Sequence, residues 1–256
     1  MALVGGRGRE VQDFIASDLG PEGMEKAVLV VATGDEPPLT RRQAAWTAMA
    51  VAEHFRDQGQ HVLLLMDSVT RFAMAQREIG LASREPPTAK GYPPTVFSEL
   101  PQMLERAGPG PMGKGDITAI FTVLVDGDDM NDPIADAVRG ITDGHVVLNR
   151  CLAEKGRYPA IDLLASVSRT LPDCHSDVEY TLLNAAHKAL AAHAYLEELI
   201  RIGAYRAGSN PELDRAISFA GPCESFLSQR KAEHTPPNVP FAEIAGQLDR
   251  AGISPG

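Results

Sequence analysis

The feature that most constrains the fold is an alternation of short apolar runs with amphipathic segments through the first two-thirds of the chain. Short strands that alternate with helices build a mainly parallel sheet with helices packed against it. Because apolar residues occupy consecutive positions within the runs, we expect strands that are buried on both faces. The strands are predicted over 2–4, 27–32, 61–66, 117–125 and 145–148, and the helices over 9–19, 40–58, 95–107 and 133–141.

The sequence pattern changes near Ser176, where long helical stretches replace the alternating short strands and helices. Helices are predicted over 177–202 and 211–229 on either side of a turn region, and a short helix over 241–252 follows a proline-rich segment. We therefore expect two domains, an α/β core over 1–175 and an all-α domain over 176–256. A first strand of three residues without a lead-in also predicts that Met1 is either an internal cut or a late start, so that the chain is part of a longer parent protein.

Composition excludes several classes of function. The formal charge of -10 opposes binding to phosphate backbones, so we expect no nucleic-acid partner. No apolar run approaches the ~20 residues that span a bilayer, and no signal peptide opens the chain, which predicts a cytoplasmic protein without a transmembrane segment. Three widely spaced cysteines without metal-ligand spacing predict reduced, buried or half-buried thiols.

An apolar run that ends in a carboxylate, His61-Val-Leu-Leu-Leu-Met-Asp67, gives the first candidate for chemistry. Parallel sheets present their ligand sites at the carboxyl ends of strands, and a carboxylate placed there can hold Mg²⁺ through its water shell. This is the Walker B arrangement. An Asp in this position also fits a turn-forming or helix-capping residue, so the run alone leaves both readings open.

A phosphate-binding loop would decide between these readings, and the segment Gly108-Pro-Gly-Pro-Met-Gly113-Lys114-Gly115 fits only part of that pattern. Gly115 stands where the pattern needs Ser or Thr, and the segment follows a predicted helix and precedes a strand, which is the reverse of the required context. Two prolines also remove backbone donors from the loop. We therefore predict a flexible surface loop at this position.

Longer motifs carry a resemblance to a known family. The segment Pro159-Ala-Ile-Asp-Leu-Leu-Ala-Ser-Val-Ser-Arg169 resembles the signature of the catalytic subunits of rotary ATP synthases and type III export ATPases. The run Leu3-Val-Gly-Gly-Arg-Gly-Arg-Glu10 resembles the family's G-E-R-G-R-E segment. The run Gly127-Asp-Asp-Met-Asn-Asp-Pro-Ile-Ala-Asp136 is similar to a segment typical of the export ATPases. The motif that begins at Asp67 and the segment Phe226-Leu-Ser-Gln229 extend the resemblance over nearly all of the chain.

This resemblance implies a RecA-like P-loop NTPase core, incomplete at its N-terminal edge, that is followed by a helical domain. It implies ATP and Mg²⁺ as ligands. Asp67 would be the Walker B carboxylate, Glu10 would bind a magnesium-bound water, and Arg71 would reach the terminal phosphate. Arg7 would contribute to nucleotide binding.

Two residues near the signature receive roles in the same way. Arg169 matches the arginine finger, which in this family stabilises charge on the nucleotide of a neighbouring subunit. Tyr158 falls where the family stacks an aromatic ring on adenine. The residue types alone also fit a surface salt bridge for Arg169 and a half-buried core tyrosine for Tyr158.

Three departures from the family concern the chemistry. Gly6 stands where the family has the catalytic glutamate that orients the attacking water, and loss of such a base removes a factor of roughly 10² to 10⁴ in rate. The family's phosphate loop lies upstream of the matched segment, so we expect residues 1–256 to bind nucleotide very weakly on their own. Lys231 and His234 stand in the region where rotary subunits place phenylalanines around adenine.

Two functions remain open from the sequence. In the first, the parent protein is a homohexameric ATPase that energises flagellar or type III protein export at the inner-membrane apparatus. Stalk and regulator proteins, export chaperones and substrates would be its partners, and the turn region 203–214 would be the tip of the helical domain. In the second, Gly6 and the missing phosphate loop mark a hydrolysis-dead paralogue that acts only as a ring or partner-binding module.

Overall fold

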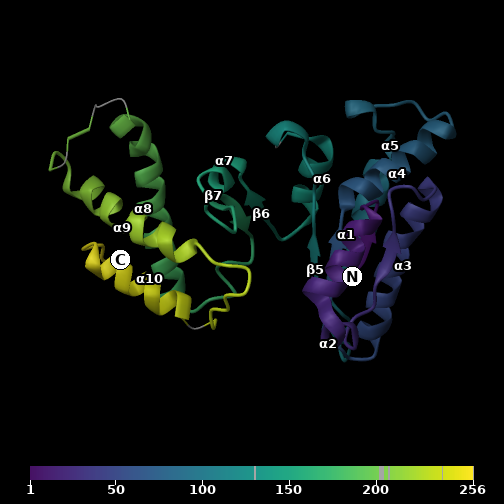
Figure 1. Ribbon diagram of the computed structural model, residues 1–256, viewed down its shortest axis with the longest axis horizontal. Coiled ribbons are helices and arrows are strands. Elements are labelled where there is room, and N and C mark those ends of the chain that lie inside the picture. The colour runs from purple at the N-terminus through teal and green to yellow at the C-terminus, as the bar shows by residue number, and fades with distance from the viewer. Residues whose placement is uncertain (130, 202–204, 207, 238, 256) are drawn as a thin grey trace. The chain divides into compact units, whose positions relative to one another are not determined.

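The computed structural model describes residues 1–256 except 130, 202–204, 207, 238 and 256, and it divides into two compact units, 1–142 and 143–256 (Figure 1). The predicted boundary at 175/176 lies inside the second unit, where strand β7 (Ile161–Ser168) contacts helix α8 (Asp177–Arg201). That boundary stays a prediction.

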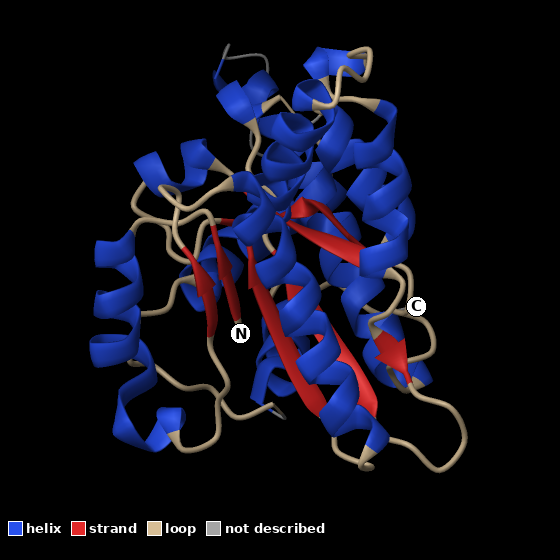
Figure 2. Ribbon diagram, turned by 90° about the vertical axis from the view of Figure 1, so that its right-hand side faces the viewer, coloured by secondary structure: helices blue, strands red, loops and turns tan. Residues whose placement is uncertain are grey.

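The first unit contains a five-stranded sheet in the order β2-β1-β3-β5-β4. Figure 2 shows the strands in red among the helices. Four neighbouring strands are parallel and β4 pairs antiparallel with β5 at the edge, which confirms the predicted, mainly parallel sheet. The strands are β1 (Ala2–Val4), β2 (Val30–Ala32), β3 (Val62–Asp67), β4 (Gly108–Pro109) and β5 (Asp116–Phe121).

The main core is formed by one face of this sheet and by the helices α3 (Pro38–Asp57), α4 (Val69–Ala82), α5 (Pro94–Leu104) and α6 (Pro133–Ile141). Small residues on α3, such as Ala45, Ala48 and Ala52, allow a close approach to the buried side chains of the strands. Pro133 is the first residue of α6, where the sequence predicts that this helix begins, and it follows the N-cap Asp132. The shorter helices α1 (Gly8–Asp13), η1 (Phe14–Leu19, π-helical) and α2 (Gly20–Met24) contain no buried residue.

The opposite face of the sheet corrects the expectation of burial on both faces. Val31, Leu63 and Ile120 are exposed by 41%, 59% and 56%, whereas Leu64, one residue along β3 from Leu63, is 2% exposed. Side chains alternate across a strand, so consecutive apolar residues point to different faces. Buried side chains of α3, α4 and α5, such as Met49, Phe72 and Leu100, belong to the core that contains Leu64. The apolar side chains of Val31, Leu63 and Ile120 on the other face remain exposed.

The second unit joins a two-stranded ribbon to a helical group. β6 (Gly144–Leu148) pairs antiparallel with β7 across a register shift, and α7 (Arg150–Glu154) lies between them in sequence. Helices α8, α9 (Pro211–Leu227) and α10 (Val239–Arg250) contact one another around a second core that includes Phe219 and Leu248 (Figure 1). Residues 202–204 and 207, in the predicted α8 end and tip, lie outside the described residues.

The thiols correct a second expectation. Cys223 is buried, but Cys151 and Cys174 are exposed, because α7 and the turn after β7 place them at the surface. Among the helices that the structure describes, none combines the length and apolar character needed to cross a membrane.

Candidate functional site

The carboxyl ends of the parallel strands bring several predicted residues to one edge of the sheet in the first unit. Leu3 of β1 pairs in register with Asp67 of β3, so the glycine turn after β1 lies beside that carboxylate. On the other side of β3, Met66 pairs with Phe121, which places Thr122 next to Asp67. The edge therefore gathers side chains from three separate parts of the sequence.

Asp67 is held by a neighbouring strand. Its Oδ1 accepts a hydrogen bond of 2.6 Å from Thr122 Oγ1. Thr122 is itself fixed, because its N–H donates to Met66 O at 3.0 Å and its carbonyl accepts the Val69 N–H at 3.0 Å. The carboxylate is exposed, and no ion pair to it is found among the described residues. One oxygen is thus oriented while the group stays accessible, which leaves acceptor capacity for a ligand.

Thr122 is a candidate site residue that the sequence analysis did not identify. It directly follows the apolar strand β5, and Asp67 is the last residue of β3, so a polar residue at a strand end is the signal that could have identified it. Knowing that β3 and β5 are neighbours was also necessary, because the two residues are 55 positions apart.

Arg71 lies in the first turn of α4. The helix is capped by Ser68, whose Oγ accepts the Arg71 N–H at 3.2 Å. A Cβ on Gly5, which has φ of 70°, would lie only 2.8 Å from the Arg71 Cβ, so a side chain at residue 5 is excluded by both contact and conformation. The glycine turn therefore packs directly against the stem of Arg71.

Gly6 differs from Gly5 in both respects. No atom lies within 4 Å of a Cβ built on Gly6, and its φ is outside the left-handed region. Its backbone is fixed, because Gly34 N–H donates to Gly6 O at 2.9 Å and Gly5 N–H donates to Ala32 O at 2.7 Å. A longer side chain at residue 6 is therefore sterically compatible with this turn.

Arg7 and Glu10 form a surface pair with an Nη1–Oε1 distance of 3.4 Å. Their side chains are 87% and 65% exposed, so the pair contributes little to stability. Among the described residues there is no group of three or more His, Cys, Asp or Glu side chains arranged to hold a metal ion. Mg²⁺ needs no such cage, because proteins commonly hold it by one or two carboxylates together with substrate phosphates.

The two remaining predicted residues belong to the second unit. The Tyr158 side chain is exposed by 58%, which argues against the reading as a half-buried core residue. Its carbonyl accepts the Gln229 N–H at 2.8 Å, in the segment singled out from the sequence. Arg169 directly follows β7, is exposed, and donates its N–H to Asp143 O at 2.7 Å. Both residues therefore combine a main-chain hydrogen bond with an exposed side chain.

The loop 108–115 is not a phosphate-binding loop, and its backbone is held by hydrogen bonds. Gly110 and Gly115 donate their N–H groups to Gly115 O and Arg56 O, at 3.0 and 2.8 Å, and Lys114 Nζ donates to Asp57 O at 2.8 Å. These contacts use the donors that a phosphate would need. They also correct the expectation of a flexible loop, because the segment closes the β4–β5 turn.

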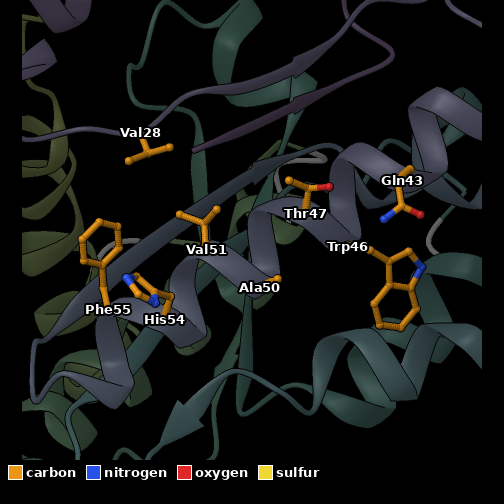
Figure 3. A pocket seen from close by; sticks show the side chains of 8 residues that line it. All are labelled: Val28, Gln43, Trp46, Thr47, Ala50, Val51, His54 and Phe55. Carbon is orange, nitrogen blue, oxygen red and sulfur yellow. The ribbon is translucent and has the colours of Figure 1, made fainter.

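The first unit also has a shallow apolar hollow, which contains none of the predicted site residues (Figure 3). Seven of its eight lining residues come from α3, and none is a predicted site residue. It is lined by Val28, Gln43, Trp46, Thr47, Ala50, Val51, His54 and Phe55. No acidic or permanently charged group lines it, so it offers no site for a phosphate or a metal ion.

Comparison with known families gives two matches along the chain. Residues 1–168 match the nucleotide-binding domain of the ATP synthase alpha/beta family. Residues 176–249 match the C-terminal domain of the type III secretion ATPase EscN. The join between the two matches falls near the domain boundary expected from the sequence.

Individual relatives agree with these matches. The flagellum-specific ATP synthase of Caulobacter vibrioides is 60% identical over 253 residues, covering 97% of this chain and 57% of that protein. The assembled ATPase EscN of enteropathogenic E. coli superposes with a TM-score of 0.92 at 47% identity, over 96% of this chain and 59% of EscN. EscN in complex with its central stalk EscO gives 0.84 at 46% identity, over 98% and 58%. The chain spans about half the length of the curated relatives it matches.

Proposed function

Because this chain belongs to the ATP synthase alpha/beta family, we propose that it forms the Walker B, arginine-finger and helical portion of an ATPase subunit that energises flagellar or type III protein export. The observation that carries the proposal is the Asp67 carboxylate, oriented by Thr122 at the carboxyl end of a central strand and accessible to a ligand. An accessible, pre-oriented acceptor at this edge is what a nucleotide-bound cation requires.

In this proposal, the first unit serves the phosphate end of ATP. Asp67 holds Mg²⁺ and Glu10 binds one of its waters, while Arg71 reaches the terminal phosphate and Arg7 supports binding. The ion would neutralise charge on the phosphates. Glu10 is paired with Arg7 at 3.4 Å in the structure, and because both groups are exposed, the pair can separate at small cost.

The second unit is proposed to serve the base and a neighbouring site. The exposed ring of Tyr158 is available for stacking on adenine, a contact worth about 1–3 kcal/mol for bases on aromatic rings. Arg169 would act as the arginine finger on nucleotide held by the next subunit, where its permanent charge and planar fork suit phosphoryl oxygens.

Gly6 supports a second candidate function, that of a hydrolysis-dead module that binds ring or export partners. A glycine has no carboxylate to orient water, and the structure keeps this backbone fixed by the bonds of Gly5 and Gly6 to neighbouring segments. The open space around the Gly6 Cβ position makes the two functions separable by one substitution.

Assembly and location are part of the same proposal. Structures of EscN are known both for the assembled ATPase and for its complex with a central stalk. The match to EscN covers nearly all of the present chain. We infer a homohexameric ring that works peripherally at the inner-membrane export apparatus in the cytoplasm, with stalk and regulator proteins, chaperones and export substrates as partners.

Magnesium-dependent ATP hydrolysis tests the proposal in four proteins: the chain, its Gly6→Glu variant, and each of these joined to the upstream portion of the Caulobacter relative. The joined form of the variant, the Gly6→Glu fusion, is expected to be at least about 10²-fold faster than the fusion with Gly6. This result would support the ATPase assignment and a missing base. Equal hydrolysis with and without the glutamate would remove the role assigned to residue 6. No hydrolysis in any of the four would favour the partner-binding module.

A further inference from the structure

A buried arginine precedes the proposed adenine platform. The Arg157 side chain is only 9% exposed, although arginine is rarely buried without partners. Its Nη1 donates to Pro159 O at 3.2 Å, and its Nε lies 3.2 Å from Glu224 Oε2 on α9, an ion pair that lacks hydrogen-bond geometry. One guanidinium therefore contacts both the segment that carries Tyr158 and a helix of the C-terminal group.

The start of this segment is fixed by the end of α7. Gly156, with φ of 80°, ends the helix, and its N–H donates to Ala153 O at 2.9 Å while the Arg157 N–H donates to Leu152 O at 3.1 Å. This pair of bonds is a Schellman motif, which sets the direction in which the chain leaves a helix. The Arg157 side chain is thereby directed from a rigid turn.

The rest of the segment is held by α9 and the residues that follow it. Gln229, just after α9, donates its N–H to the Tyr158 carbonyl at 2.8 Å, and Arg157 binds the next carbonyl, that of Pro159. Two consecutive carbonyls are thus held, while the Tyr158 ring remains 58% exposed. The backbone of Tyr158 is ordered and its ring is free to meet a ligand.

We propose that Arg157 is a positioning residue that fixes the Tyr158 backbone and ties it to α9, so that a shift of this helix changes the presentation of the ring to the base. The role in nucleotide binding rests on the proposed function of Tyr158. The tie to α9, meaning the link that Arg157 makes between the Tyr158 segment and this helix, rests on the Arg157 contacts alone. Holding a binding side chain in place before the ligand arrives reduces the ordering cost of binding.

Hydrogen exchange in the unfused chain tests the tie without nucleotide. In Arg157→Ala, the Gln229 amide is expected to lose protection relative to amides in the middle of α9, because the Tyr158 carbonyl is no longer held in place. Arg157→Lys keeps a cation beside Glu224 and is expected to retain part of that protection. Unchanged Gln229 exchange in Arg157→Ala, or a uniform loss across the second unit, would overturn the inference.

Steady-state kinetics of the Gly6→Glu fusion test the consequence for binding. Arg157→Ala is expected to raise KM for ATP by about 5-fold or more with a smaller change in kcat, since about 5-fold is the lower end of the loss of a base–aromatic contact. If Arg157 acts through Tyr158, the double variant with Tyr158→Ala is no worse than Tyr158→Ala alone.

The outcomes separate the tie to α9 from its consequence for nucleotide binding. Additive effects of the two substitutions, or a normal KM in Arg157→Ala, would overturn the positioning role. A Tyr158→Ala variant with normal KM would overturn it as well, together with the proposed adenine contact. A fusion without any ATP hydrolysis would contradict the proposed function, and the Gln229 exchange would then decide the tie by itself.

Discussion

The two units hold their predicted functional residues in different ways. In the first unit the Asp67 side chain accepts a hydrogen bond of 2.6 Å from the hydroxyl of Thr122, which directly follows the neighbouring strand β5. In the second unit the main chains of Tyr158 and Arg169 are hydrogen-bonded, and both side chains are exposed. A side chain that is oriented by the fold suits a fixed electrostatic task, whereas an exposed side chain is accessible to a ligand or to another subunit.

Removal of Arg169 is expected to have the largest effect on activity. In the Gly6→Glu fusion, Arg169→Ala is expected to lower kcat by about 10³- to 10⁵-fold, the range for an arginine finger. Arg215→Ala, at an exposed arginine of α9, is the matched control and is expected to leave kcat unchanged. Loss of activity in both variants would point to a general effect of removing surface charge.

Mixing variants then shows whether the outward-facing residue acts on another subunit. Arg169→Ala and Asp67→Asn proteins, each inactive alone, are expected to recover part of the ATPase activity when they form mixed rings, because some interfaces then combine an intact Asp67 with an intact Arg169. Absence of any recovery in rings shown to be mixed would place both residues in one subunit's site.

The oriented carboxylate of the first unit is tested by a pair of substitutions. Asp67→Asn in the fusion is expected to lower ATP hydrolysis by about 10²- to 10³-fold through loss of charge stabilisation. Thr122→Val removes only the hydroxyl that orients Asp67. This variant is expected to raise the Mg²⁺ concentration needed for half-maximal activity by about 10- to 100-fold. Titration of activity against Mg²⁺ concentration separates the two effects. Equal losses at saturating Mg²⁺ would contradict an orienting role for Thr122.

A change in the free energy of unfolding is expected to distinguish the two faces of the sheet. Leu64→Ala is expected to lower the free energy of unfolding by about 2–5 kcal/mol, because the side chain is buried in the main core. Leu63→Ala, at the exposed neighbour, is expected to change it by about 0.5 kcal/mol or less. Urea unfolding followed by circular dichroism measures both. Similar losses would show that the Leu63 face is covered in solution.

Thiol reactivity gives the smallest expected effect, within the second unit. Burial, and then the nearby Glu224 carboxylate, raise the pKa of the Cys223 thiol to about 11, whereas Cys151 and Cys174 are exposed. Modification by a thiolate-specific reagent at pH 8 is therefore expected at Cys151 and Cys174 well before Cys223.

The same pKa shift affects stability in alkaline solution. The raised pKa favours the neutral thiol in the folded state, so its contribution to stability is present below the ordinary value of 9.0 and is lost as pH rises towards about 11. Comparing urea unfolding of the chain and of Cys223→Ala at several pH values measures this contribution. A difference that does not change above pH 9 would contradict it.

The sequence predicts most local features correctly. Apolar runs predict β1, β3 and β6 to within one or two residues, and the helical stretches of the sequence predict α6, α8 and α9. The two family matches lie over the expected core and helical segments. These features depend on residues close together in the chain, and local pattern reports them well.

Two elements inside the motifs were not predicted as such. α4 begins within the Asp67 motif, and β7 lies within the signature that ends at Arg169. β7 pairs with β6 through a register shift that no local pattern encodes. Within a motif, residue types are selected for chemistry as well as for secondary structure. The hydrophobic periodicity that predicts helices and strands is therefore weaker there.

The sequence alone indicated the family, most of the strands and helices in their order along the chain, and the residue types available for ATP chemistry. The folded structure added that Thr122 is hydrogen-bonded to Asp67, that Arg157 contacts both the Tyr158 segment and α9, that Gly6 has room for a side chain, and that one apolar face of the sheet is exposed. These features could not be predicted from the sequence, because hydrogen bonds and burial depend on which distant segments become neighbours, whereas secondary-structure periodicity depends on neighbours in sequence.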